Sequence, residues 1–385
     1  MASSSRRAAA FALARWILTK EFIPSLLPDG PDRAFIQDLV YTSIRRLRPL
    51  RFVLGKLVNK WPKGELEALL YIGAAQVLYM DDVPDFAAVS ETVEAAKSAK
   101  GSSASVVNGV LRNLIRRREE FIELLKDSPL EVRESFPTRL VRRWEERFGK
   151  ENAAELCRIH NAPAETFLAR PDGTYVQLER GCKVSSVPGY DQGSFIVQDP
   201  AARHAVELLD VHPGERILDA CAAPGGKAVQ IAWRGASLTA CEVNPNRRRR
   251  LEENLSRLNL KDVKVISDIP QVGDACFDKV LVDAPCSNTG VFRRRPDARW
   301  NWSEEKMLSL VELQSSILEK VAPLVSPGGI LVYSTCSNEV EENLSQVKSF
   351  LAKHKEFSLS SERESLPFQT NQDGAYAAAF IRNGD

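Results

Sequence analysis

The stretch that decides the fold is Arg216-Ile217-Leu218-Asp219-Ala220-Cys221-Ala222-Ala223-Pro224-Gly225-Gly226-Lys227. It begins as a short apolar strand, passes into a turn of small residues and leads into a predicted helix. Small residues let the backbone approach a ligand, and the start of a helix offers free amide groups. A Walker phosphate loop needs glycine at position 221 and serine or threonine at 228, where this chain has Cys221 and Ala228. The turn therefore predicts a ligand site of another kind, with a plain glycine-rich turn as the alternative.

The sequence around this stretch alternates between short β-rich runs and helical segments. Predicted strands cover residues 216–220, 238–242, 263–267, 279–282 and 330–334, and predicted helices cover 228–232, 246–258, 305–322 and 339–353. Such alternation predicts an α/β Rossmann-like domain, in which helices cover both faces of a mostly parallel sheet. Ligands of these folds lie beyond the carboxyl ends of the strands. The residues after each strand are therefore the candidate site.

Acidic residues stand at three successive strand ends. Glu242 comes 23 residues after Asp219, the spacing at which nucleotide-binding sheets place a carboxylate on the ribose hydroxyls. Asp268, after the third strand, is placed to accept a hydrogen bond from an adenine amine. Solvation of strand ends explains any one acid, but three in register favour a ligand that carries a ribose and no phosphate.

Two cysteines follow the next two strands, in Asp283-Ala284-Pro285-Cys286-Ser287 and Ser334-Thr335-Cys336-Ser337. A single buried cysteine is usually a small apolar residue. A pair at one sheet edge favours chemistry, because carbon 5 of cytosine attacks a methyl sulfonium only after a thiolate has added to carbon 6. The carbon 5 proton must then leave, which requires a base or a second thiol. Asp283 is placed to bind the base edge at ring nitrogen 3.

Basic residues follow the first of these cysteines. The segment 291–300 contains Phe292 and Trp300 together with the candidate RNA-binding residues Arg293, Arg294, Arg295, Asp297 and Arg299. Cations for phosphates and rings for base stacking are what single-stranded RNA requires. A charged surface loop is the alternative.

The rest of the chain suggests three domains, as its 385 residues exceed one ordinary core. Residues 1–127 carry helical periodicity, 128–198 form a connecting, RNA-positioning subdomain, and 199–385 form the α/β domain. Residues 1–150 hold 25 Lys and Arg against 19 Asp and Glu. This excess suggests a polyanionic partner, although on its own it is more often explained by a solvated, charged helix face.

The seven cysteines are widely spaced, with no CxxC pair, and only four histidines occur. We therefore expect neither a disulfide framework nor a metal site, and a reducing compartment such as the cytoplasm. No apolar run approaches the roughly 18 residues that a membrane span needs.

The motifs together resemble the bacterial RNA cytosine-C5 methyltransferases of the Sun/Fmu type, in the NOL1/NOP2/Sun family. The likeness rests on residues 221–227 and 283–287, on Arg294-Arg295-Pro296-Asp297, on residues 334–337 and on residues 193–199. Residues 88–93 and 107–112 resemble the NusB-like RNA-binding domain of the subgroup that acts on small-subunit ribosomal RNA. The resemblance covers most of the chain.

This resemblance implies S-adenosylmethionine as cofactor, bound by Cys221, Ala222, Ala223, Pro224, Gly225, Gly226, Lys227, Glu242, Asp268 and Asp283. It implies that Cys336 is the nucleophile, that Cys286 assists product release, and that Asp283 completes the catalytic set. The expected partner is RNA, foremost 16S rRNA, and the expected enzyme is a monomer without metal or membrane. Another RNA such as tRNA is the alternative substrate. A ribosome-assembly protein with a vestigial catalytic domain is the alternative class, which two retained thiols argue against.

Overall fold

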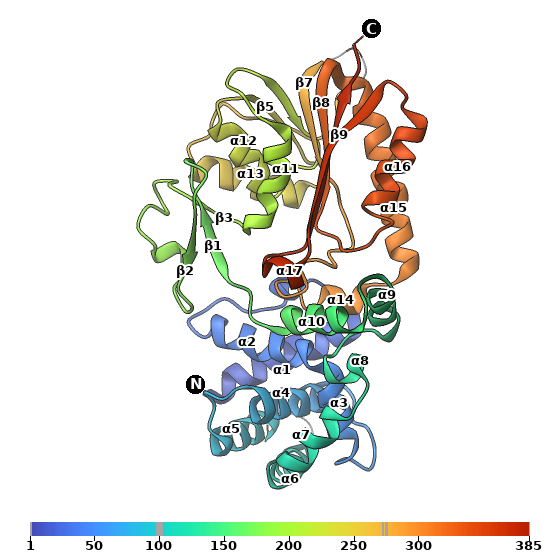
Figure 1. The fold of residues 1–385 in the computed structure, drawn as a ribbon. Coiled ribbons are helices and arrows are strands. Elements are labelled where there is room, and N and C mark those ends of the chain that lie inside the picture. The colour runs from blue at the N-terminus through green and yellow to red at the C-terminus, as the bar shows by residue number, and fades with distance from the viewer. Residues whose placement is uncertain (1, 98–102, 272, 274–275, 385) are drawn as a thin grey trace. The chain divides into compact units, whose positions relative to one another are not determined.

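The computed structural model describes residues 2–97, 103–271, 273 and 276–384 (Figure 1). The chain forms two compact units. The helical unit comprises Met1–Ala162 and the short segment Arg295–Asn301. The sheet unit comprises Pro163–Arg294 and Trp302–Asp385. Residues 128–162, which the sequence assigned to a connecting subdomain, group with the helical unit.

The helical unit is built from amphipathic helices around one apolar core. Buried residues of α1, α2, α4, α5 and α6 recur at helical spacing and form this core, which also receives Trp300. The Trp300 indole donates a hydrogen bond to the Ile44 carbonyl (3.0 Å) and so fixes the segment 295–301. The helices are α1 (Ala2–Thr19), α2 (Arg33–Arg45), α3 (Leu47–Gly55), α4 (Glu65–Tyr79), α5 (Asp85–Lys97), α6 (Ser103–Arg116), α7 (Arg118–Lys126), α8 (Leu130–Arg133), α9 (Thr138–Phe148), α10 (Lys150–Asn161) and α14 (Ala298–Asn301).

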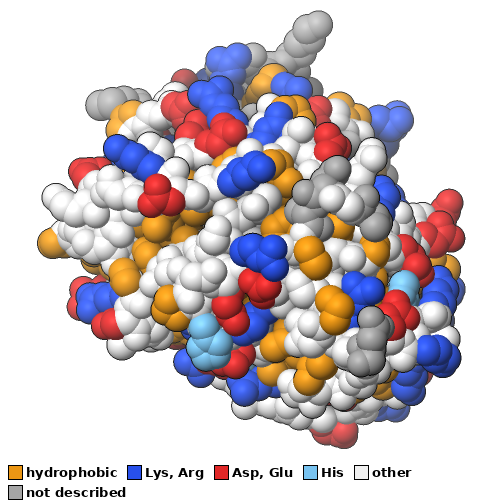
Figure 2. All heavy atoms as spheres, turned by 90° about the horizontal axis from the view of Figure 1, so that it is seen from above, with side chains coloured by type: hydrophobic (Ala, Val, Ile, Leu, Met, Phe, Trp, Pro, Cys, Tyr) orange, Lys and Arg blue, Asp and Glu red, His pale blue; other side chains and the backbone are white. Residues whose placement is uncertain are grey.

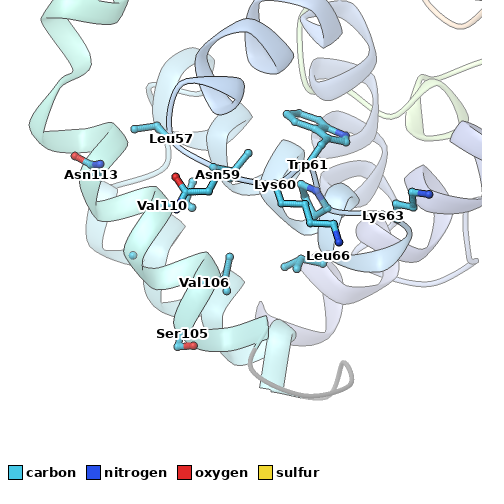
Figure 3. A pocket seen from close by; sticks show the side chains of 13 residues that line it. Leu57, Asn59, Lys60, Trp61, Lys63, Leu66, Ser105, Val106, Val110 and Asn113 are labelled. Atoms are coloured by element: carbon cyan, nitrogen blue, oxygen red, sulfur yellow. The ribbon is translucent and has the colours of Figure 1, made fainter.

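A pocket of about 780 Å³ opens on the helical unit between the segment 57–66 and α6 (Figure 3). Its walls are apolar, with Trp61, Leu66 and Val106 among them, and Lys60 and Lys63 also line it. Both lysines are exposed, and no acidic residue lines the pocket among the described residues. The pocket therefore combines an apolar floor with positive charge.

The sheet unit contains a seven-stranded sheet in the order β6-β5-β4-β7-β8-β10-β9. The strands are β4 (Arg216–Asp219), β5 (Ser237–Cys241), β6 (Lys264–Ile266), β7 (Phe277–Asp283), β8 (Val325–Thr335), β9 (Phe357–Ser365) and β10 (Ala375–Arg382). The first five in this order are parallel neighbours, whereas β10 pairs antiparallel with both β8 and β9. Sequence order reverses between β4 and β7, so the topological switch point lies between these strands.

Helices cover both faces of this sheet, as Figure 1 shows for α11 (Arg203–Leu209), α12 (Gly226–Trp233) and α13 (Pro245–Arg257) on one face and α15 (Glu304–Val321) and α16 (Leu344–Lys353) on the other. Side chains alternate between the two cores along each strand. Ile217 and Leu281 belong to the core under α11–α13, whereas Leu218 and Val280 belong to the core under α15 and α16. The predicted Rossmann-like α/β class and helical N-terminal domain are thus confirmed.

The remaining elements are small. A three-stranded sheet joins β1 (Thr166–Ala169) to β2 (Tyr175–Leu178) and β3 (Ile196–Val197), and α17 (Pro367–Thr370) precedes β10. Short 3-10 helices occur at Ile23–Ser25, Val184–Ser186, Pro200–Ala202 and Ala322–Leu324. No helix in the described part of the chain is long and apolar enough to span a membrane.

The face drawn in Figure 2 lies at the amino ends of the parallel strands, away from the candidate site. Basic and acidic side chains alternate on it, and neither sign forms a broad patch. Among the described residues visible on this face, no broad basic patch is present for a polyanion.

Candidate active site

The predicted site residues assemble along the carboxyl edge of the parallel strands. Asp219 ends β4, Asp283 ends β7, and Cys336 follows β8 directly. Glu242 follows β5, and Asp268 comes two residues after β6. Because all five strands run in the same direction, these side chains share one edge, as the sequence predicted.

The turn after β4 is fixed by helix α13. The Arg247 guanidinium donates to the Ala223 carbonyl and the Asn254 amide donates to the Pro224 carbonyl, both at 2.8 Å. The Ala223–Pro224 peptide is cis, and Gly225 has a φ of 113°. A side chain at Gly225 would be strained there, and its Cβ would lie 3.0 Å from the Leu251 side chain. The turn is thereby held close to the start of α12.

Three of the carboxylates at this end of the sheet, those of Asp219, Glu242 and Asp268, differ in environment. Asp219 is 1% exposed, and only one of its carboxylate oxygens has a partner, the Cys221 amide at 3.3 Å. The other oxygen has no hydrogen-bond partner among the described residues. Burial, reinforced by the nearby Asp283 charge, raises the pKa of Asp219 to about 7. Glu242 is also buried and accepts from the Asn244 amide at 2.9 Å, whereas Asp268 is exposed.

An ion pair lies at the switch point. The Lys227 ammonium is 2.7 Å from one oxygen of Asp283, and the Ser334 hydroxyl donates to the other oxygen at 2.8 Å. Burial alone lowers the pKa of Lys227, but the Asp283 carboxylate outweighs it and the net pKa is raised. Lys227 therefore stays cationic next to Cys336, with which it lines a common cavity.

The two predicted cysteines are in contact. Their Sγ atoms are 3.2 Å apart, and the Sγ of Cys336 is 3.4 Å from the side-chain oxygen of Asn288. The hydrogen bond with Cys336 raises the pKa of Cys286, and burial and the Cys336 and Glu342 charges act in the same direction. Either sulfur can be the donor in the contact between the two cysteines, and the Cys336 thiol donates to the Asn288 side-chain oxygen.

The sulfur of Cys336 is not packed in hydrocarbon. Cys336 is partly exposed and borders a cavity of about 70 Å³ whose polar lining includes Asp199, His204, Lys227 and Asp373. Among the described residues no group of His, Cys, Asp and Glu is arranged to hold a metal ion.

The arginine segment has a different role from the one predicted. Arg293 is 3% exposed, and its guanidinium pairs with Asp199 at 3.1 Å and with Asp373 at 2.5 Å. Arg294 pairs with the same two carboxylates. These arginines hold the segment after Cys286 against two distant parts of the sheet unit.

Within the helical unit, Arg299 is fully buried. It donates to the Asn161 side chain at 2.7 Å and to the His160 carbonyl at 3.0 Å, and it stacks 3.9 Å from the Phe136 ring centre. Asp297 is 1% exposed and pairs with Arg295 at 3.4 Å. The prediction that Arg293, Asp297 and Arg299 contact RNA needs correction, because all three are buried. Arg293 and Asp297 form ion pairs with protein groups, and protein oxygens accept hydrogen bonds from Arg299. Arg295, 38% exposed, remains accessible.

Sequence reasoning missed the residues that organise the site from behind. Asp199 and Asp373 bind the arginines, and Glu342 accepts hydrogen bonds from Ser287 and Ser337 beside the two cysteines. Asp199 ends the segment 193–199 that carries part of the resemblance, yet its partner Arg293 lies 94 residues away in sequence, and Asp373 lies 80 residues from the same arginine. Glu342 lies in a polar segment in which no sequence motif indicated a role for it.

Comparison with known proteins follows the division into two units. A family model described as 16S rRNA methyltransferase RsmB/F matches residues 206–381, and a NusB family model matches residues 3–116. A ribosomal RNA small subunit methyltransferase B of Yersinia pestis is 32% identical over 426 residues, which cover 98% of each chain. The Serratia proteamaculans protein of the same name is 33% identical over 425 residues, again 98% of each chain.

Among solved structures, the crystal structure of PH0851 superposes with a TM-score of 0.80 at 21% identity and covers 98% of each chain. At this identity the likeness concerns the fold, and it extends over both units.

Proposed function

Because this chain belongs to the RsmB/F family of 16S rRNA methyltransferases, we propose that it methylates carbon 5 of a cytosine in 16S rRNA, with Cys336 as covalent nucleophile. The resemblance seen in the sequence is thereby confirmed at the level of the family, and the chain is an RNA methyltransferase with a NusB domain. The observation that supports the finer proposal best is the contact of two thiols beside the Lys227–Asp283 ion pair.

The edge at the switch point fits S-adenosylmethionine. When bound, this cofactor supplies a methyl group that is electrophilic because its sulfur is positively charged. The buried, unpartnered oxygen of Asp219 suits a cationic ligand. Residues 221–227 form the turn that would lie against it, Glu242 would accept the ribose hydroxyls, and Asp268 would accept the adenine amine. The Glu242 carboxylate now accepts a hydrogen bond from the Asn244 amide, and it would have to give up part of this bond to accept the ribose hydroxyls.

Cys336 suits the nucleophile for two reasons. The Lys227 cation nearby stabilises a thiolate, and the Cys286 thiol in contact with Cys336 is close enough to donate a hydrogen bond to that thiolate. In the proposed reaction the Cys336 thiolate forms a bond to cytosine carbon 6, and the electron pair of the carbon 5–carbon 6 double bond moves toward ring nitrogen 3. Asp283, once it carries a proton, is the proposed acid or hydrogen-bond donor at that nitrogen, and the Lys227 cation lies beside it.

Carbon 5 then takes the methyl group. The addition of Cys336 to carbon 6 must afterwards be reversed to release the product. The proton on carbon 5 leaves to a base, the double bond re-forms and the carbon–sulfur bond to Cys336 breaks. Cys286 is the group that assists this step, because it lies against the sulfur that must depart. For this, Cys286 first loses its thiol proton to solvent. Its thiolate then takes the carbon 5 proton as the double bond re-forms, and Cys336 leaves as a thiolate.

The experiment that tests the proposal uses cofactor labelled on its methyl group and 16S rRNA from a strain that lacks this enzyme. We expect label on carbon 5 of one cytosine, detected after digestion to nucleosides, and bisulfite sequencing locates it. Cys336→Ala should abolish transfer, because it removes the proposed nucleophile. Cys276→Ala, which removes an exposed thiol, is the matched control and should retain full activity.

Two alternative functions predict different results in this experiment. A tRNA enzyme would label tRNA and leave 16S rRNA unlabelled. An assembly protein with a vestigial site would bind RNA and transfer nothing. Because the RNA substrates of this reaction are cytoplasmic, we place the enzyme in the cytoplasm.

A further inference from the structure

Glu342 is a fully buried carboxylate between the two cysteine-bearing loops. One oxygen accepts the Ser287 backbone amide at 2.9 Å and the Gln314 side-chain amide at 3.0 Å. The other oxygen accepts the hydroxyls of Ser287 and Ser337. No Lys, Arg or His forms an ion pair with it in the described part of the chain. Four neutral donors therefore stabilise this charge, one for each of its acceptor positions.

The proton positions in this cluster follow from the donor count. Ser337 has one hydroxyl proton, and that proton goes to Glu342. The Ser337 oxygen must then accept the Glu339 amide at 3.0 Å and the Thr289 hydroxyl at 3.1 Å. Thr289 in turn accepts the Asn338 amide at 2.8 Å. The loop 287–289 and the loop 337–339 are thus joined by hydroxyl hydrogen bonds that lead to one carboxylate, directly from Ser287 and Ser337 and through Ser337 from Thr289.

The bonded serines directly follow the thiols in sequence. Ser287 comes after Cys286, and Ser337 comes after Cys336. The backbone of Glu342 is itself anchored, because its carbonyl accepts the Tyr333 hydroxyl of β8 at 2.6 Å. One side chain therefore sets the position of both cysteine loops relative to a strand of the sheet.

We propose that Glu342 is a positioning residue that holds the Cys286 and Cys336 thiols in contact, so that they act on one cytosine. The effect of Glu342 on catalysis rests on the function proposed above. Its effect on the distance between the two thiols does not depend on that function. A displacement of about 1 Å in a catalytic group costs on the order of 100-fold in rate. Glu342 needs no contact with RNA or cofactor to have such an effect.

Glu342→Gln is the informative variant because it preserves size and removes half of the acceptors. Its amide nitrogen must face either the Ser287 amide or the two hydroxyls, and a backbone N–H cannot rotate away as a hydroxyl can. Glu312→Gln is the matched control, since Glu312 is exposed on the same helix, α15, that carries Gln314. Ser287→Ala is the milder second variant, which keeps the backbone amide bond and loses one hydroxyl donor.

Thiol geometry is measured with phenylarsine oxide, which binds two close thiols at once and releases water as two arsenic–sulfur bonds form. Binding to the Cys286–Cys336 pair is the part of the phenylarsine oxide binding that is lost in Cys286→Ala. We expect one such site in the wild-type protein, an affinity at least 10-fold lower in Glu342→Gln, a smaller loss in Ser287→Ala and no change in Glu312→Gln.

Steady-state kinetics on 16S rRNA should move with the thiols. We expect kcat of Glu342→Gln to fall 10- to 100-fold while KM for RNA and for cofactor stays within twofold, and Ser287→Ala to follow with a smaller fall. A lower kcat with wild-type arsenical affinity would overturn the proposal, as would wild-type values of both. If the wild-type protein transfers no methyl group, the proposed function fails, and the arsenical measurement still decides whether Glu342 holds the thiols.

Discussion

At the scale of single residues, the carboxylates at the sheet edge differ in what their surroundings provide. Asp283 has a cation and a hydroxyl, Glu242 has a backbone amide and an arginine, and Asp219 has one weak amide contact in a buried place. A buried charge without compensation destabilises the folded state. A cationic cofactor would therefore lower the free-energy cost of ionising Asp219.

We predict that Asp219→Asn changes how stability depends on pH. The folded pKa of Asp219, about 7, is above its unfolded value, so the folded protein loses stability as pH rises toward 7 and keeps that deficit above it. The deficit amounts to roughly 4 kcal/mol. The variant lacks it, so its Tm should exceed that of the wild type more at pH 8 than at pH 5.

Thermal unfolding of both proteins at the two pH values, without cofactor, measures this difference. A Tm gap that is equal at both pH values would contradict the account. Added S-adenosylmethionine should then stabilise the wild type more than the variant, because only the wild type gains a partner for the buried charge.

At the scale of elements, the close approach of three backbone segments places Cys336. The Gly290 amide donates to the Cys336 carbonyl at 3.0 Å, and the Gly374 amide donates to the Gly290 carbonyl at 2.8 Å. No side chain fits there. A Cβ at Gly290 would lie 2.7 Å from backbone atoms of Gly374 and 2.8 Å from the Cys336 carbonyl oxygen.

Gly290→Ala should therefore destabilise the protein by about 1–3 kcal/mol and move the Cys336 loop. We expect at least a 10-fold loss of methyl transfer, measured alongside urea unfolding. Gly55→Ala is the control, because a Cβ at Gly55, the last residue of α3, meets no atom within 4 Å. That control should be stabilised by roughly 0.5–1 kcal/mol, with unchanged activity. Equal behaviour of the two variants would refute the packing argument.

The five parallel strands were predictable from sequence because each is a short apolar run. The antiparallel pair was not. β9 reads Phe-Ser-Leu-Ser-Ser-Glu-Arg-Glu-Ser and is exposed along most of its length, and β10 is rich in alanine, which favours helices. Helix α16 was predicted from residue 339 but begins at Leu344, because the side chains of Ser337 and Asn343 bond the backbone of the preceding loop.

The positions of candidate site residues were predictable where these residues follow a strand, as at Glu242, Asp283 and Cys336, and their roles stay predictions. The site was not predictable where a residue acts across long sequence separations. Arg293 and Arg294 have the composition of an RNA-binding loop, yet they pair with Asp199 and Asp373. A sequence shows the charge of an arginine and not whether the fold supplies its carboxylate.

At the scale of the whole molecule, the helical unit is where we expect the sequence-independent part of RNA binding. Its pocket pairs Lys60 and Lys63 with the apolar surface of Trp61 and Leu66 (Figure 3). Positive charge next to an aromatic ring suits phosphates and an unstacked base.

The double variant Lys60→Glu/Lys63→Glu should raise KM for RNA and leave kcat at saturating RNA unchanged. The dependence of affinity on salt should become shallower, with the log–log slope reduced by about 1–2. Filter binding at several salt concentrations measures it. Lys348→Glu/Lys355→Glu reverses two exposed lysines of the sheet unit and is the charge-matched control. Equal weakening in both variants would mean that net charge, and not this pocket, governs binding.

The most direct measurement of the covalent step uses Cys286→Ala with cofactor and 16S rRNA. Without the thiol that assists release, a protein–RNA complex that survives denaturation should accumulate, and peptide mass spectrometry should place the nucleotide on Cys336. The doubly substituted protein, which also carries Cys336→Ala, should form none. A complex that persists without Cys336, or an attachment at any other residue, would contradict the assignment of the nucleophile.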